Sequence, residues 1–199
     1  MAGVISNGSV APATMEAILA RSLAIPRDSL AKLTGIVRII DLPKGHLVLG
    51  AGKLERDIYF MVQGIARVYY YRDGNAATLC FNSEGDVLIS LKSYIENQPG
   101  YENIELLEPS RLLQLRTNDI NKLYASDIHI ANWGRRLAEL ELIKTEERLM
   151  SKLFNTASER YRELIQTQPQ LLQRVQLGHI ASYLGISQVT LSRIRAEVR

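Results

Sequence analysis

The residues best able to do chemistry lie near the C-terminal end of the chain, between Ser187 and Arg195. If Leu191 and Ile194 face a helical core, the side chains left outside that core carry hydroxyl, amide and guanidinium groups and no carboxylate. Such groups suit the phosphates and the base edges of DNA. The outward-facing residues are expected to be Gln188, Val189, Ser192, Arg193 and Arg195.

The spacing of residues 177–196 predicts two short helices joined by a tight turn. Ile180 and Leu184 are four residues apart, which gives the first helix a core face. Gly185 follows where the chain leaves this helix, because glycine adopts the left-handed conformation of a helix end without steric cost. Ser187 is a good N-cap for the second helix. This arrangement is typical of a helix-turn-helix; the alternative is a purely structural helical hairpin.

The net charge of the chain is concentrated in its C-terminal part. Lys and Arg number 24 against 21 Asp and Glu, which gives a formal charge of +3. Residues 1–126 carry 13 basic and 13 acidic side chains, so residues 127–199, with 11 basic and 8 acidic, account for the whole excess. This excess agrees with nucleic-acid binding, but an ordinary solvated surface explains it equally well.

Several classes of protein are disfavoured by the composition. The N-terminal segment lacks the basic and apolar regions of an export signal, and no apolar stretch is long enough to span a membrane, so we expect a soluble, cytoplasmic protein. The single cysteine, Cys80, cannot by itself form a disulfide or hold an iron–sulfur cluster. His46, His129 and His179 are too dispersed to indicate a metal site, although a haem would need only one or two of them. An enzyme built on a small β barrel is the competing class, but we find no nucleophile with a base, no metal triad and no phosphate loop.

Short strand patterns separated by turns occupy residues 37–115 and predict a small β sandwich or barrel. The segment from Arg72 to Asn75 contains Asp-Gly and predicts a hairpin turn. Two short helices are expected before the strands, over residues 15–23 and 29–33. The strands themselves are expected at residues 37–40, 46–49, 58–62, 65–71, 78–81, 104–107 and 112–115.

After residue 115 the apolar pattern changes to a helical period. Thr117 or Asn118 is expected to cap a short helix, and Asp127 is expected to cap a longer one. The longer helix has an apolar seam that could pack on the β domain of its own chain or pair with the same helix of a second subunit. We predict a dimer interface, because a helix-turn-helix protein commonly binds two half-sites as a two-fold dimer. The seam consists of Ile130, Trp133, Leu137 and Leu140.

The order of these parts, and several segments within them, resemble the Crp/Fnr family of bacterial transcription regulators. The segments are LPKGHLVLGAG (42–52), DIYFMVQGIARVYY (57–70), FNSEGD (81–86), SERYRELI (158–165) and HIASYLGISQVTLSRIR (179–195). The resemblance implies an α+β fold with an N-terminal jelly roll of the cyclic-nucleotide-binding type over residues 1–126. It also implies a long dimerisation helix over residues 127–150 and a helix-turn-helix domain over residues 151–199. The function that it implies is that of a homodimer acting on a two-fold symmetric operator in double-stranded DNA, with RNA polymerase as a further partner.

The resemblance, carried over residue by residue, implies which side chains contact DNA. Gln188 and Val189 fall where family members contact base edges, and Arg193 falls where an arginine usually reads a guanine. The chemistry agrees, because arginine bonds guanine bidentately, glutamine does the same with adenine, and valine can touch a thymine methyl. His179 could reach a phosphate or simply face solvent. The other expected phosphate contacts are Gln176, Ser187, Thr190 and Ser192.

Two features depart from the family pattern. Cyclic-nucleotide-binding members clamp the phosphate with an Arg-Ser or Arg-Thr pair, but no arginine lies between Arg72 and Arg111, and Lys92 is the only basic residue there. We therefore expect no cofactor, and an effector other than a typical cyclic nucleotide, or none. Between the SERYRELI segment and Gln176 the chain has little more than TQPQLLQRV (167–175). The β wing that many relatives carry before the helix-turn-helix is therefore expected to be reduced or absent. The alternative function is a ligand-binding or protein-interaction module whose terminal helices dock a partner.

Overall fold

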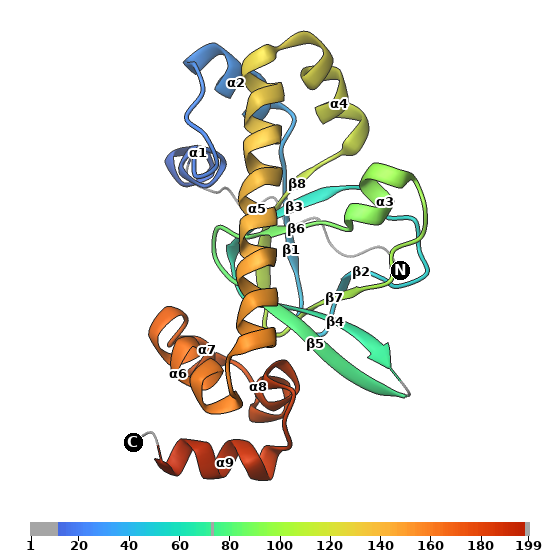
Figure 1. Ribbon diagram of the computed structural model, residues 1–199. Helices are drawn as coiled ribbons and strands as arrows, with labels where there is room; N and C mark the ends of the chain where they lie inside the picture. The colour runs from blue at the N-terminus through green and yellow to red at the C-terminus, as the bar shows by residue number, and fades with distance from the viewer. Residues whose placement is uncertain (1–11, 73, 198–199) are drawn as a thin grey trace. The chain divides into compact units, whose positions relative to one another are not determined.

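The computed structural model describes residues 12–72 and 74–197, which form two compact units (Figure 1). The first unit combines the chain up to Val68 with Phe81–Glu141, and the second combines Tyr69–Cys80 with the chain from Leu142 onward. These units do not coincide with the three predicted domains, whose boundaries at 126 and 150 remain a prediction.

The first unit contains both helices and strands. Its helices are α1 (Pro12–Leu19), α2 (Arg27–Gly35), α3 (Leu91–Glu96), α4 (Thr117–Ser126) and the first part of α5 (Ile128–Phe154). The strands are β1 (Arg38–Leu42), β2 (Leu47–Leu49), β3 (Ile58–Gln63), β4 (Ala66–Arg72), β5 (Asn75–Asn82), β6 (Val87–Leu88), β7 (Asn103–Leu106) and β8 (Ser110–Leu115). Strands β4 and β5 continue into the second unit.

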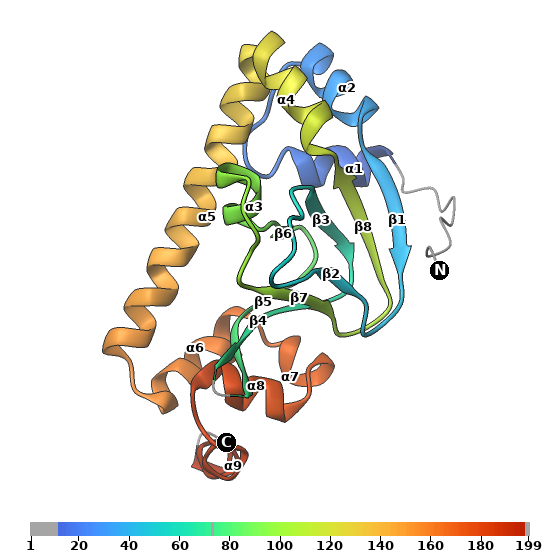
Figure 2. The same ribbon diagram turned by 90° about the vertical axis from the view of Figure 1, so that its right-hand side faces the viewer.

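The strands form two four-stranded sheets, in the orders β1-β8-β3-β6 and β2-β7-β4-β5. The β1–β8, β3–β8, β3–β6 and β2–β7 pairings are antiparallel (Figure 2). In the first sheet Ile39 lies opposite Leu113, and Tyr59 lies opposite Gln114. Two antiparallel sheets with this crossed strand order form a jelly-roll-type sandwich. The predicted fold class is therefore confirmed.

The sheet β1-β8-β3-β6 is buried on both faces, because successive residues of a strand point to opposite sides. Phe60 and Leu113 pack in a cluster that also contains Trp133 of α5. Met61 and Leu112, their immediate neighbours in the chain, belong to a second cluster that includes residues of the other sheet. The apolar runs in β3 and β8 therefore supply the core on both sides of one sheet.

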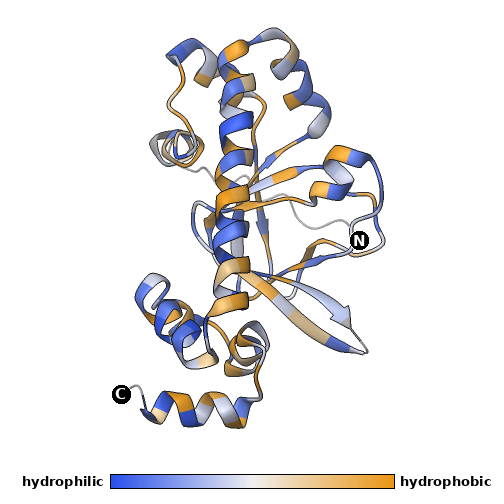
Figure 3. Ribbon diagram, in the orientation of Figure 1, coloured by the Kyte–Doolittle hydropathy of each residue, from blue (hydrophilic) through white to orange (hydrophobic). Residues whose placement is uncertain are grey.

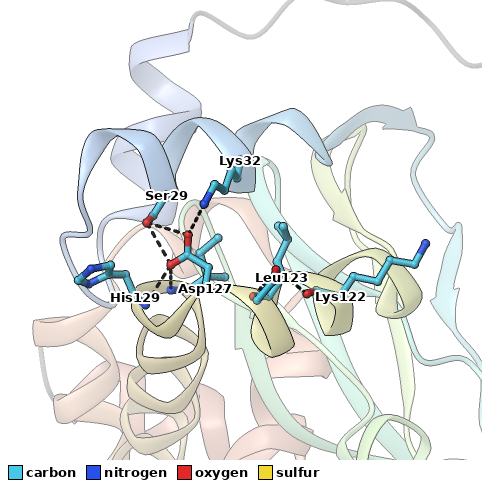
Figure 4. Close-up of polar contacts among 8 residues, drawn as sticks. Ser29, Lys32, Lys122, Leu123, Asp127 and His129 are labelled. Carbon is cyan, nitrogen blue, oxygen red and sulfur yellow. Dashed lines mark hydrogen bonds and ion pairs between the residues drawn. The ribbon is translucent and has the colours of Figure 1, made fainter.

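The start of α5 is held by the carboxylate of Asp127 (Figure 4). It accepts hydrogen bonds from the backbone N–H groups of His129 at 3.1 Å and Ile130 at 3.4 Å, which confirms the predicted helix cap. Asp127 also bonds to two α2 residues, accepting from Ser29 Oγ at 3.0 Å and from Lys32 Nζ at 2.9 Å. The hydrogen bond from Lys32 is the main reason why the pKa of Asp127 is lowered to about 2.

The predicted cap of α4 is wrong. Arg116 occupies the N-cap position and makes no side-chain capping bond, so neither Thr117 nor Asn118 caps the helix. The Thr117 hydroxyl instead donates to the Arg56 carbonyl at 2.5 Å. The Thr117 N–H is satisfied from outside the helix by the Asp57 carboxylate at 3.2 Å. The free helix end is thus completed by a long-range contact that local spacing cannot reveal.

The first half of the predicted dimer seam lies inside the first unit. Ile130 and Trp133 are both 0% exposed, and Trp133 Nε1 donates to the Leu19 carbonyl at 2.6 Å. A side chain with no exposed area cannot be buried further by a second subunit, so the prediction of a dimer contact is wrong for these two residues. Leu137 packs against the same cluster while partly exposed, and a dimer contact at Leu137 or Leu140 remains a prediction.

The second unit contains the C-terminal helices α6 (Ala157–Thr167), α7 (Leu171–Arg174), α8 (Leu177–Leu184) and α9 (Gln188–Glu197). Helix α6 begins with a reciprocal capping box between Thr156 and Glu159.

Asp73 of the predicted hairpin turn lies outside the described residues, while Gly74 beside it has a φ of 78°. Within residues 12–72 and 74–197, no helix combines the length and the apolar character needed to cross a membrane.

Three short elements have no counterpart among the sequence predictions. They are β6, α3 and α7, which contain 2, 6 and 4 residues respectively. Hydrophobic periodicity needs a longer window than these segments offer. Their places are decided by the larger elements around them.

Candidate nucleic-acid interface

Helices α8 and α9 form the predicted helix-turn-helix. The buried residues of α8 are Ile180, Ala181 and Leu184, and those of α9 are Leu191 and Ile194. The sequence assigns four of them, Ile180, Leu184, Leu191 and Ile194, to the core faces of the two helices. Burying them leaves the opposite face of α9 to solvent.

The turn and the cap between the two helices follow the predicted chemistry. Gly185 has a φ of 69° at the end of α8, a left-handed conformation that favours glycine. The next N–H, of Ile186, donates to the Ala181 carbonyl at 3.0 Å and completes the end of the helix. Ser187 Oγ accepts the Thr190 N–H at 3.1 Å, which caps α9. The start of α9 is thereby fixed by short-range bonds.

All seven predicted DNA contacts are exposed. Val189 has 63% of its surface exposed, a large value for an apolar side chain near the first turn of a helix. The hydroxyl groups of Ser187 and Thr190 lie 2.9 Å apart and share a hydrogen bond. The exposed set, whose contacts with DNA remain a prediction, comprises Gln176, Ser187, Gln188, Val189, Thr190, Ser192 and Arg193.

Gln188 lies against α8 at Gly178. A Cβ atom on Gly178 would be 2.7 Å from Gln188 Nε2, which is closer than real side chains approach. The glycine therefore allows the Gln188 amide to lie across the start of the first helix. The predicted base-reading side chain is close to the Gln176 end of α8, where a phosphate contact is predicted.

Arg160 supports the helix-turn-helix, and sequence reasoning did not identify this role. From α6 its guanidinium donates to the Leu184 carbonyl at 2.7 Å and to the Asn155 carbonyl at 2.5 Å. Leu184 is the last residue of α8, so Arg160 satisfies a carbonyl that has no partner within the helix. The sequence signal for this role is the SERYRELI segment, in which the local pattern does not distinguish Arg160 from a surface residue.

The part of α5 that belongs to the second unit carries a stripe of exposed leucines. Leu142, Leu149 and Leu153 are 67%, 54% and 65% exposed, and this end of the helix is marked by hydrophobic segments (Figure 3). They follow Trp133 by 9, 16 and 20 positions in the chain. At about 3.6 residues per turn, each of these leucines is rotated about the helix axis by roughly half a turn from Trp133. The exposed stripe therefore lies on the side of α5 opposite the predicted seam.

Known proteins provide matches to both the sequence and the structure. Residues 39–127 match the cyclic nucleotide-binding domain family, whereas no curated protein sequence matches the chain. The structure of FixK2 from Bradyrhizobium japonicum is similar, with a TM-score of 0.71, 19% identity, and coverage of 82% of this chain and 84% of FixK2. The c-di-GMP responsive global regulator CLP of Xanthomonas campestris gives a TM-score of 0.67 with 14% identity, covering 87% of this chain and 91% of CLP. The catabolite activator protein of Thermus thermophilus gives 0.56 with 19% identity, covering 91% of this chain and 86% of that protein.

The chain has the fold of the Crp/Fnr regulators. The predicted resemblance is therefore confirmed, and residues 39–127 carry the match to the cyclic nucleotide-binding domain family. Residues 155–176, all of which the structure describes, contain helices α6 and α7 between the end of α5 and the start of α8, and no strand. This agrees with the predicted reduction or absence of the wing.

The interval between Arg72 and Arg111 contains the segment where the resemblance places the clamp for a cyclic phosphate. Glu102 is only 8% exposed, and its carboxylate accepts the Tyr101 N–H at 3.1 Å. The guanidinium beside Gly85 belongs to Arg21, which precedes the strands and donates to the Glu84 carbonyl at 2.9 Å. The cluster between the sheets is apolar, comprising Val48, Leu49, Met61, Ala66, Leu88, Ile104, Leu106 and Leu112.

Proposed function

We propose that the chain is a sequence-specific DNA-binding transcription regulator of the Crp/Fnr type. The observation that carries this proposal is the exposed face of α9, a capped helix that presents Gln188, Val189 and Arg193 without a carboxylate among them. An exposed helix of this kind fits the major groove, where arginine and glutamine can each make two bonds to a purine. In this proposal Arg193 reads a guanine, and Gln188 and Val189 contact neighbouring bases.

The second part of the proposal concerns the phosphates on either side of these bases. Gln176 and Ser187 stand at the beginnings of α8 and α9, where helix N-termini favour negative charge. Thr190 and Ser192 add exposed hydroxyl groups on the same short helix. These contacts would orient the helix-turn-helix without reading sequence, and DNA binding would weaken as the salt concentration rises.

The third part of the proposal is a homodimer that binds a two-fold symmetric operator. Its support is the exposed leucine stripe of Leu142, Leu149 and Leu153, because water-exposed apolar residues at helical spacing favour pairing with a second helix. The interface would thus begin further along α5 than the sequence predicts, and on the opposite side of the helix from Leu137 and Leu140. At a promoter, such a dimer would act through RNA polymerase.

The effector in this proposal is not a typical cyclic nucleotide. The interval between Arg72 and Arg111 contains no arginine, and the nearly buried Glu102 would repel a phosphate. Regulation without a small effector is compatible with the same features.

The decisive experiment is a genome-wide selection of duplex fragments with the full chain, followed by binding assays on the enriched sequence. Enrichment of a two-fold symmetric site, bound more tightly than scrambled DNA, supports the proposal. A folded, dimeric protein that binds no duplex would overturn the proposal in favour of a protein-interaction module. Turnover of a small molecule by the chain would favour an enzyme.

A further inference from the structure

The tip of one β hairpin belongs to the same compact unit as the helix-turn-helix. Residues Tyr69–Cys80 belong to the unit of the C-terminal helices, although β4 begins and β5 ends in the first unit. The chain passes between the two units within β4, within β5 and within α5, and in no case through an irregular linker. The hairpin is therefore covalently continuous with the strands of the β sandwich and belongs to the same unit as the helices proposed to bind DNA.

One side chain of α8 joins the hairpin through three hydrogen bonds. The hydroxyl of Ser182 donates to the Ala76 carbonyl at 2.9 Å. The same oxygen accepts the Thr78 N–H at 3.0 Å and the Thr78 hydroxyl at 3.1 Å. A serine hydroxyl has one donor and two acceptor positions, so all three are used on β5. Thr78 is 3% exposed, which means that its N–H would be costly to leave without a partner.

We propose that Ser182 is a positioning residue for DNA binding, which anchors α8, and with it α9, to the hairpin Tyr69–Cys80. This inference rests on the proposed function and adds the element through which the β sandwich would regulate it. The anchored state is the one competent to bind, because Gln188, Val189 and Arg193 are all exposed while Ser182 is bonded to β5. A movement of β4 and β5 in the sandwich would then be transmitted to α8 through the hydroxyl of Ser182.

The anchor preorganises α8 and α9 for DNA binding. When the anchor is broken, α8 and α9 sample orientations that do not match the groove. The apparent affinity then falls in proportion to the fraction of molecules that remains competent. Ser182 does not face the bases, so this loss should be equal for the preferred operator and for operators with altered base pairs. A base-reading residue would behave differently, since its loss relaxes selectivity at one position.

The test uses the full chain and three variants. Ser182→Ala removes the hydroxyl, and Ser182→Thr retains it. The control variant is Ser158→Ala, which removes a half-buried serine of α6 that makes none of these bonds. Hydrogen exchange at the Thr78 amide reports directly on the anchor, and titration of the selected operator reports on DNA binding. We expect Ser182→Ala to speed Thr78 exchange and to weaken operator binding by roughly five- to tenfold, with selectivity and dimerisation unchanged. Ser182→Thr and Ser158→Ala should resemble the wild type in both measurements.

A double-mutant cycle tests the pair itself. Thr78→Val removes one of the three bonds and should weaken operator binding in the wild-type background but have little further effect in Ser182→Ala. The inference is overturned if Ser182→Ala exposes the Thr78 amide and leaves operator affinity unchanged, or if the two substitutions act independently. A wild-type chain that binds no duplex while its Thr78 amide is protected would instead overturn the proposed function, so the two failures can be told apart.

Discussion

Lys32 Nζ lies 2.9 Å from the carboxylate of Asp127, so a residue of α2 is paired with the residue that caps α5. The carboxylate also accepts the Ser29 hydroxyl, and its side chain is 5% exposed while that of Lys32 is 53% exposed. The long helix therefore begins at a point that is fixed to the N-terminal helices as well as to its own backbone.

This pair predicts a pH dependence of stability. The pKa of Asp127 in the folded chain is lowered to about 2 from an ordinary value of 3.8, so the charged form is favoured by folding. Its contribution is complete above the unfolded pKa and is lost as the pH falls from about 4 to about 2. Urea unfolding of wild type and Asp127→Asn should differ most above pH 5 and converge toward pH 2. The matched control is Asp28→Asn, which removes an exposed carboxylate of α2 and leaves the Asp127 contacts in place, so the loss of stability between about pH 4 and about pH 2 should persist in that variant.

Arg193→Ala is expected to weaken binding to the selected operator by roughly 1 to 3 kcal/mol and to relax selectivity at one base pair. The reason is the loss of a bidentate contact with a guanine. Fluorescence anisotropy on operators mutated one base pair at a time measures both effects. Arg162→Ala, on the exposed side of α6, removes the same charge and should leave selectivity intact. Unchanged selectivity in Arg193→Ala would contradict the assignment.

Leu149→Glu and Leu153→Glu are expected to raise the dissociation constant of the proposed dimer by about tenfold or more, because each places a charge in the apolar interface proposed for α5. Analytical ultracentrifugation over a concentration series measures this change. Glu147→Gln, on the same helix, serves as the control. A dimer of undiminished strength in both leucine variants would show that α5 pairs through another face or that a different surface is used.

Gly185→Ala is expected to destabilise the helix-turn-helix by about 1 kcal/mol, because an alanine is strained in the left-handed conformation at φ 69°. No atom lies within 4 Å of the added methyl group, so the loss comes from the backbone alone. Gly35→Ala provides the matched comparison, since the space is equally free there and φ is not positive. Chemical unfolding should separate the two: Gly35→Ala should be neutral or stabilising, and equal losses would exclude backbone strain as the cause.

Local patterns predicted the parts of the fold whose stabilising partners are close in sequence. The helix-turn-helix has its cap, turn glycine and core residues within residues 180–194, and each was assigned to its observed place. The strands of the sandwich are recognisable because the alternation of apolar and polar residues and the turns between strands are local sequence patterns. The cap of α4 failed because Asp57, 60 residues away in the chain, takes the role assigned to Thr117 or Asn118.

The sequence by itself determined the order of the parts and the chemistry that the second helix of the helix-turn-helix presents. Only the tertiary structure decided that Ile130 and Trp133 are used inside their own chain, and that the exposed stripe lies on the other side of α5. It also decided that Ser182 bonds to Thr78, 104 residues earlier. The physical reason is that helix periods and caps are set by neighbours a few residues apart, whereas these contacts exist only after distant elements have packed together.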